Sequence, residues 1–97
     1  MLEEFLAKKP DDVFSRYGLA LECMNSDDSA AADLHFRALL KYHADYIPAY
    51  LMYGQLLARE SRAEEARRVL STGIDAAAKA GNHHARSEME ALLNDLS

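Results

Sequence analysis

The sequence is poor in the residues that cross-link or interrupt a chain. Its 97 residues include one cysteine, two prolines and four glycines. The single thiol, Cys23, has no second cysteine with which to form an internal disulfide, so the chain suits a reducing compartment. Few prolines and glycines leave long stretches in which helices can form without interruption.

Long apolar runs and an excess of positive charge are also missing. The N-terminal residues lack the basic start and the apolar core of a secretory signal. No stretch approaches the ~18 apolar residues of a membrane span. The net charge of -5 gives no general electrostatic attraction to nucleic acid or to anionic lipid. We therefore expect a cytoplasmic protein that binds neither nucleic acid nor membrane.

The sequence carries no recognisable catalytic or metal-binding motif. His35 and His43 are eight residues apart, and His83 and His84 are adjacent, so neither pair has the i, i+4 spacing of a helical metal site. Glycine-rich phosphate loops and nucleophile motifs do not occur. We expect no metal, no cofactor and no catalytic residue, and hence a protein that is not an enzyme.

Apolar residues, which make up 49% of the sequence, recur at helical spacing along nearly the whole chain. No segment alternates as a half-buried strand does. Asp12 and Asn82 suit helix N-termini, and Ser61 and Glu64 have the spacing of a capping box. These patterns predict an all-α fold of about six helices, at residues 2–9, 11–25, 29–43, 47–60, 62–80 and 82–97.

Two parts of the sequence are similar to each other. When Gly18 is aligned with Gly54, the letters FSRYGLAL lie over YLMYGQLL. Further along, A-x-x-x-F at 32–36 aligns with A-x-x-x-L at 66–70. The glycines are 36 residues apart and the alanines 34, which predicts two additional residues in the turn around 25–28.

This pattern resembles the tetratricopeptide repeat, a 34-residue helix–turn–helix unit. The residues that fill the family's structural positions, and that we expect to face the core, are Phe14, Tyr17, Gly18, Leu21, Ala32, Phe36, Tyr50, Tyr53, Gly54, Leu57, Ala66 and Leu70. The resemblance implies a short right-handed solenoid of stacked antiparallel hairpins. It divides a single domain of residues 1–97 into a half-repeat helix at 1–10, repeats at 11–44 and 47–80, and a capping helix at 82–97.

Gly54 lies inside an expected helix, where glycine costs about 1 kcal/mol relative to alanine. In the family, this glycine lies against the small residue of the second helix, here Ala66, and lets the two backbones approach. Overpacking such a contact costs about 1–3 kcal/mol. We therefore expect Gly54→Leu to destabilise the fold.

The resemblance also implies a function, which is to bind a peptide or a helix of a partner protein as a small adaptor or scaffold. Exposed positions of the first helix of each repeat would line the concave groove. These positions are Asp12, Ser15, Leu19, Glu22, Leu51, Gln55, Ala58 and Arg59. The alternative is a structural module that forms a homo-oligomer and has no separate peptide ligand.

A local basic cluster stands apart from these positions. It consists of Arg59, Arg62, Arg67 and Arg68. Such a cluster can bind an acidic peptide or a nucleic acid, but glutamates lie beside and between the arginines in the sequence. We interpret the cluster as a solvated face that these glutamates partly neutralise.

Overall fold

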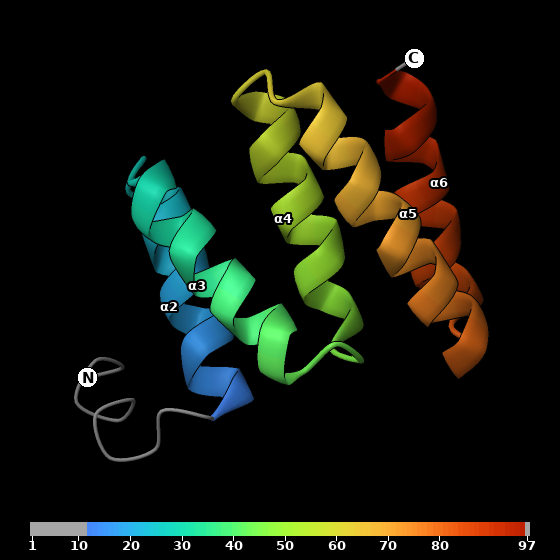
Figure 1. The fold of residues 1–97 in the computed structure, drawn as a ribbon, viewed down its shortest axis with the longest axis horizontal. Helices are drawn as coiled ribbons and strands as arrows, with labels where there is room; N and C mark the ends of the chain where they lie inside the picture. The colour runs from blue at the N-terminus through green and yellow to red at the C-terminus, as the bar shows by residue number, and fades with distance from the viewer. Residues whose placement is uncertain (1–11, 97) are drawn as a thin grey trace. The chain divides into compact units, whose positions relative to one another are not determined.

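The computed structural model describes residues 12–96 and contains only α-helices and turns in that range (Figure 1). The helices are α2 (Val13–Asn25), α3 (Ser29–Tyr42), α4 (Ile47–Arg59), α5 (Ala63–Ala80) and α6 (His83–Asp95). The expectation of an all-α fold is confirmed, and the helix bounds agree closely with those expected. The expected helix at 2–9 lies outside the described residues. The chain divides into two compact units, with the boundary between Tyr46 and Ile47.

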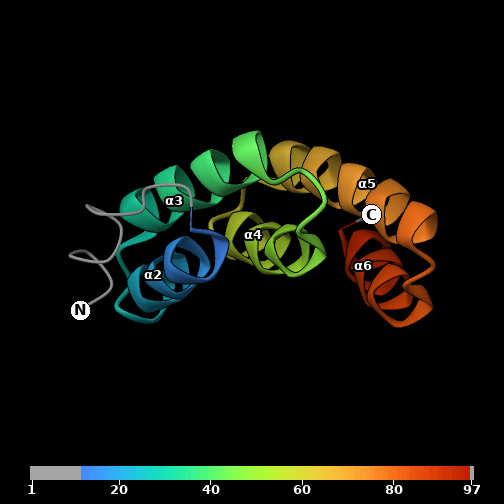
Figure 2. The ribbon, with the colours of Figure 1, turned by 90° about the horizontal axis from the view of Figure 1, so that it is seen from below.

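The first unit is an antiparallel pair formed by α2 and α3 (Figure 2). Asp12 and Asp28 cap the two helices, because each carboxylate accepts a hydrogen bond from the backbone N–H three residues later. The side chains of Ala32, Phe36 and Leu39 on α3 are fully buried, as the repeat pattern predicted for the first two.

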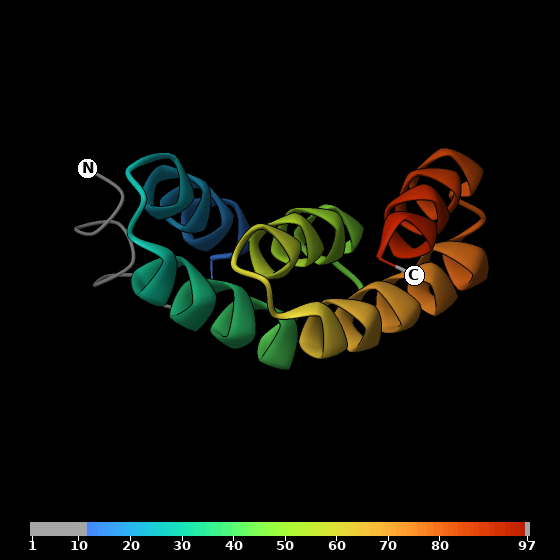
Figure 3. The same cartoon turned by 90° about the horizontal axis from the view of Figure 1, so that it is seen from above.

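In the second unit, α4 and α6 lie on the same side of α5 (Figures 2 and 3). The fully buried side chains of this unit include Leu56, Leu57, Leu70 and Met89. The three helices converge at Gly73 of α5. A Cβ atom at this position would lie 2.5 Å from Cβ of Tyr50 and 2.6 Å from Sδ of Met89, so only glycine fits without movement of α4 or α6.

Gly54 of α4 is also a site of close approach, but its neighbour differs from the one expected. A Cβ atom at Gly54 would lie 2.5 Å from Cδ2 and 2.8 Å from Cγ of Leu70. The contact is therefore made to the large side chain of α5 rather than to Ala66. Glycine at position 54 makes room for Leu70, which is fully buried.

Three of the helices end in the same backbone turn. In each turn one residue has a left-handed conformation, with φ of 59° at Asp27, 62° at Ser61 and 71° at Gly81. Its N–H donates to the carbonyl three residues back, at 3.1–3.2 Å, and the next N–H donates to the carbonyl five residues back, at 2.8–2.9 Å. This is the Schellman arrangement, which satisfies the carbonyls left free at a helix C-terminus.

The expected capping box at Ser61 and Glu64 is wrong. Ser61 lies in the left-handed position that closes α4, and α5 begins two residues later, with Arg62 at its N-cap and no side-chain cap. Glu64 pairs instead with Arg67, at 3.2 Å. The spacing S-x-x-E fits a capping box. Ser61, however, belongs to the turn that closes α4, so it is not the N-cap of α5.

The structure also corrects the alignment of the two repeats. α2 and α4 each contain 13 residues, and they begin 34 residues apart. The left-handed residues Asp27 and Ser61 are likewise 34 apart, so the turn after α2 holds no additional residues. Gly18 is therefore not the equivalent of Gly54. The equivalent is Ala20, which is fully buried, so a small side chain takes the place of glycine in the first unit.

This shift of two residues changes which face of α2 is buried. The buried side chains of α2 are those of Ser15, Leu19, Ala20 and Met24. Arg16 lies on the same side and its guanidinium is 3.2 Å from Nδ1 of His35 on α3. Phe14, expected in the core, is 72% exposed. Apolar residues surround most of α2, so the helical period alone fits more than one inward face.

Candidate functional site

An exposed aromatic surface lies on the first unit. Phe14, Tyr17 and Leu21 follow one another at i, i+3 and i+7 along α2, and so form one stripe. Phe14 is the most exposed large apolar side chain of this stripe, while Tyr17 and Leu21 are half-buried. Tyr46, in the connection that follows α3, lies beside them. We call these four residues the aromatic surface.

The rings of the aromatic surface pack edge to face. The centroid of Tyr46 lies 5.2 Å from that of Tyr17 and 6.3 Å from that of Phe14, with interplanar angles of 67° and 88°. Aromatic pairs favour this arrangement, and each is worth about 0.5–1.5 kcal/mol beyond the area it buries. Tyr46 is also held by its own N–H, which donates to the carbonyl of His43 at 3.0 Å. The surface is therefore held in place before any partner arrives.

Tyr17 supplies a polar group within this apolar surface. Burial raises the pKa of its phenol above the ordinary value of 10.0, and the nearby Tyr46 raises it further. Both causes disfavour the phenolate, so the hydroxyl keeps its proton throughout the physiological range. A neutral hydroxyl can donate one hydrogen bond and accept others at a contact that is otherwise apolar.

The expected groove positions of α2 are not brought together on the surface. The expectation that Ser15 and Leu19 are exposed is wrong, because both are only 7% exposed. Asp12 is engaged as the N-cap of α2, where its Oδ2 accepts a hydrogen bond from Ser15 N–H at 2.8 Å. Glu22 is exposed. Of the four positions in α2, only Glu22 therefore presents a free face to solvent.

The expected positions of α4 are more accessible. Gln55 and Arg59 are exposed, whereas Leu51 and Ala58 are half-buried. With the corrected offset of 34, Leu51 and Gln55 correspond to Tyr17 and Leu21 of α2. The stripe of the aromatic surface is therefore the equivalent of the α4 face that was already expected to bind.

Sequence reasoning missed the aromatic surface because it placed Phe14 and Tyr17 in the core. A usable signal was present in the sequence. The spacing of 34 between Ala32 and Ala66 is the full family period and needs no additional residues in the turn. Applying it to the whole repeat would have placed Ala20, not Gly18, opposite Gly54.

The basic cluster is largely engaged within the second unit. Arg62 makes a two-pronged ion pair with Glu65, at 2.6 Å and 3.0 Å. Arg67 pairs with Glu64 and also donates to the carbonyl of Leu96 at 2.9 Å. These contacts agree with the interpretation of a partly neutralised face.

The titratable side chains of residues 12–96 do not form a metal site, since no group of three or more potential ligands gathers there. His84 pairs with Glu88 at 2.9 Å on an exposed face of α6. Cys23 is half-buried and takes part in no disulfide with the described residues. Within the same range, none of the helices combines the length and the apolar character needed to cross a lipid bilayer.

Comparison with known proteins gives two results without a match. No model of a known protein family matches this chain. No curated protein is similar to it either.

Solved structures, by contrast, are closely similar. A tetratricopeptide repeat domain protein from Salinibacter ruber, solved in solution, has 30% sequence identity and a TM-score of 0.84 over 90% of this chain and 88% of its own. Its crystal structure has 29% identity and a TM-score of 0.82, over 88% and 96%. A protein from Bordetella parapertussis has 27% identity and a TM-score of 0.84, over 98% and 83%.

Proposed function

Because the chain belongs to the tetratricopeptide repeat family, whose members generally bind other proteins, we propose that it is a non-catalytic protein-binding module. The aromatic surface of α2 receives an apolar segment, a peptide or a helix, of the partner protein. The observation that carries the proposal is the 72% exposure of Phe14 within an ordered cluster of rings.

An exposed phenylalanine is informative because its burial is favourable. Covering an apolar side chain of this size contributes about 1.5–3 kcal/mol. Aromatic residues that are rigid and exposed are also the usual anchors of protein interfaces. The edge-to-face contact with Tyr46 limits the motion of Phe14, so less conformational entropy is lost when a partner binds.

Exposed polar residues among the expected groove positions would then set selectivity. On the first unit, Glu22 of α2 is exposed and offers a negative charge. On the corresponding face of the second unit, Gln55 and Arg59 of α4 are exposed and offer an amide and a positive charge. Leu51 adds half-buried apolar surface on α4. No cofactor takes part in this function. The proposed compartment is the cytoplasm, where the thiol of Cys23 stays reduced.

The test is photo-crosslinking from position 14. A photoreactive phenylalanine analogue replaces Phe14 in one sample and Leu34 in another, and each is illuminated in lysate of the source organism. Leu34 is the matched control, because it is 64% exposed but lies on α3. We expect one protein to be crosslinked from position 14 and not from position 34, and mass spectrometry of the product to identify its segment.

Two glutamate substitutions test whether Phe14 is needed for binding. Phe14→Glu is expected to abolish capture of the crosslinked partner, whereas Leu34→Glu retains it, with both variants giving the wild-type circular dichroism spectrum. Equal capture by the two variants would move the binding site away from the aromatic surface. Absence of any specific partner from position 14 would remove the basis of the proposal.

A further inference from the structure

The aromatic surface leaves a ring face open to solvent. Phe14 has an edge-to-face neighbour in Tyr46, whose ring is nearly perpendicular to it, at 88°. A ring has two faces, and one such neighbour covers at most one of them, which agrees with the 72% exposure of Phe14. The π electrons give each face of an aromatic ring a partial negative charge. The surface can therefore attract a cation as well as an apolar side chain.

The basic side chains of the first unit are engaged elsewhere. Residues 12–46 contain three lysine or arginine side chains, and each of them has a contact outside the aromatic surface. These contacts join Arg16 to His35 at 3.2 Å, Arg37 to Asp33 at 2.8 Å, and Lys41 to the ring of Tyr42, whose centroid is 5.6 Å from the ammonium nitrogen. A cation supplied by a partner does not have to displace any of these contacts.

The charge around the rings is negative. Residues 12–46 contain six aspartate or glutamate side chains against the three cations. Asp45 directly precedes Tyr46, is exposed, and makes no ion pair with any of the described residues. Adjacent Cα atoms are about 3.8 Å apart, so the Asp45 carboxylate lies within roughly 10 Å of the Tyr46 ring, the range of charge interactions at about 0.1 M salt. Asp12, as the N-cap of α2, offsets the positive end of the helix dipole beside Phe14.

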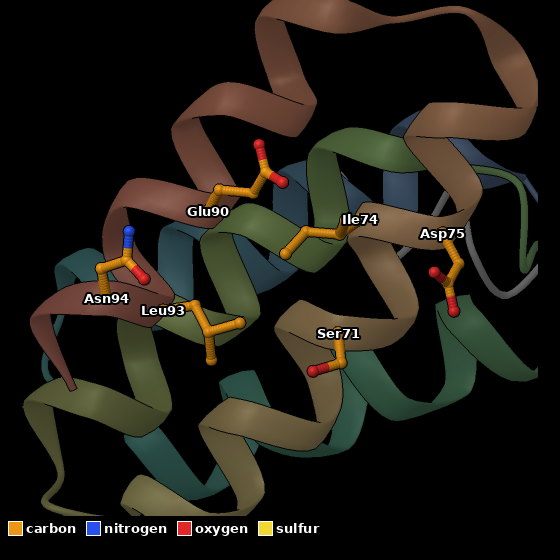
Figure 4. Close-up of a pocket in the computed structure, with 6 residues that line it drawn as sticks. All are labelled: Ser71, Ile74, Asp75, Glu90, Leu93 and Asn94. Atoms are coloured by element: carbon orange, nitrogen blue, oxygen red, sulfur yellow. The ribbon is translucent and has the colours of Figure 1, made fainter. Parts of the chain in front are cut away.

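The hollow between α5 and α6 in the second unit lacks these properties (Figure 4). Its lining contains only two apolar side chains, Ile74 and Leu93, and no aromatic ring. Asp75 has Lys79 one helical turn away, and Glu90 pairs with Arg86 at 3.5 Å. Each carboxylate of the hollow therefore already has a cation on its own helix. The aromatic surface is the better site for a cation from outside.

We propose that the partner segment bound by the aromatic surface carries a basic side chain, lysine or arginine, whose charged group lies on the open ring face of Phe14 and near Asp45. This inference rests on the proposed function and adds to it the chemistry of the partner. A basic side chain has an apolar stem and a charged end. The stem would cover the apolar stripe that leads to Leu21, while the charged end meets the ring and the carboxylate.

The first test is selection of random peptides, displayed on phage, against the immobilised chain. The same library is selected against Phe14→Ala, and only peptides that bind the wild type and not this variant are sequenced. We expect these peptides to combine apolar residues with an excess of lysine or arginine over the unselected library. Comparison with the variant removes peptides that bind only because the chain has a net charge of -5.

The second test is a double-mutant cycle on one selected peptide, measured by calorimetry. Its arginine is replaced by the neutral isostere citrulline, or its lysine by norleucine, and Phe14 is replaced by leucine, which keeps an apolar side chain but removes the ring. We expect Phe14→Leu to weaken binding of the charged peptide roughly three- to tenfold more than binding of the neutral one. Phe14→Tyr, which keeps a ring, should bind both peptides as the wild type does.

Tyr42→Leu is the matched control, because it removes a ring that is 63% exposed but already has Lys41 over it. It should leave the affinity for both peptides unchanged. Peptides that depend on Phe14 but show no excess of basic residues would overturn this inference and leave the proposed function standing. A cycle in which the ring and the cation contribute independently would do the same. Failure to recover any peptide that depends on Phe14 would overturn both proposals.

Discussion

At the scale of single residues, two glycines make close contacts that differ in how easily they can yield. A Cβ atom at Gly73 would meet Cβ of Tyr50, which moves only with the backbone of α4. A Cβ atom at Gly54 would meet Cδ2 and Cγ of Leu70, which can shift without movement of the α5 backbone. The sequence showed that Gly54 was unusual, but nothing in the helical pattern distinguished Gly73 from the apolar residues around it.

This difference predicts the outcome of two matched substitutions. Gly73→Ala should lower the free energy of unfolding by about 1–3 kcal/mol, the usual cost of overpacking. Gly54→Ala should change it by less than about 1 kcal/mol, because the gain in helix propensity offsets the movement of Leu70. Gly54→Leu remains expected to destabilise. Urea denaturation followed by circular dichroism measures all three, and a larger loss for Gly54→Ala than for Gly73→Ala would contradict the geometry.

A third residue-scale prediction concerns Ser61, which has φ of 62°. A left-handed conformation costs a non-glycine residue about 1–2 kcal/mol, a cost that glycine avoids. Part of this gain is lost because glycine has more conformational freedom in the unfolded state. Ser61→Gly should therefore raise the free energy of unfolding by about 0.5–1 kcal/mol, seen as a higher melting temperature. Ser87→Gly, on the exposed face of α6, is the control. It should lower the free energy of unfolding, because glycine is unfavourable inside a helix.

At the scale of elements, Arg67 joins α5 to the end of α6. Its guanidinium donates to the carbonyl of Leu96, where the negative end of the helix dipole favours a cation. Arg67→Met keeps much of the side-chain stem but removes this bond, together with the exposed ion pair to Glu64. We expect a loss of about 0.5–1.5 kcal/mol and faster amide exchange in the last turn of α6.

Arg68→Met is the control for this prediction, because Arg68 is the exposed neighbour of Arg67 on α5. A substitution on such a surface should change stability by less than about 0.5 kcal/mol. Equal exchange rates in α6 of the two variants would show that the Leu96 contact does not hold the helix end.

The elements themselves could be predicted from helical periodicity, but the inward face of α2 could not. Five of the expected helices are present because prolines, glycines and capping residues mark their ends, and Asp12 and Asn82 cap as expected. α2 has apolar side chains on more than one face, so periodicity alone cannot choose between them. The repeat period of 34 places Ala20, rather than Gly18, at the equivalent of Gly54, and the full burial of Ala20 agrees with it.

At the scale of the whole molecule, the fold class and the family could be predicted because they depend on a period, which a sequence displays directly. The candidate surfaces depend on which side chains remain exposed after packing. Phe14 was expected inside and is outside, while Leu19 was expected outside and is inside. The repeats expected at 11–44 and 47–80 remain a prediction, and the helix starts of 13 and 47 show a period of 34.

The turn shared by α2, α4 and α5 has a consequence for how such a chain can change over evolutionary time. Each of these helices closes with one left-handed residue and the same two backbone bonds, although that residue is aspartate, serine or glycine. The junction is therefore defined by backbone geometry and tolerates different side chains. A duplication or deletion of 34 residues would join one such turn to another without creating a new local structure. The helical hairpin can therefore be duplicated as a unit, after which substitutions on its exposed face leave the junction unchanged.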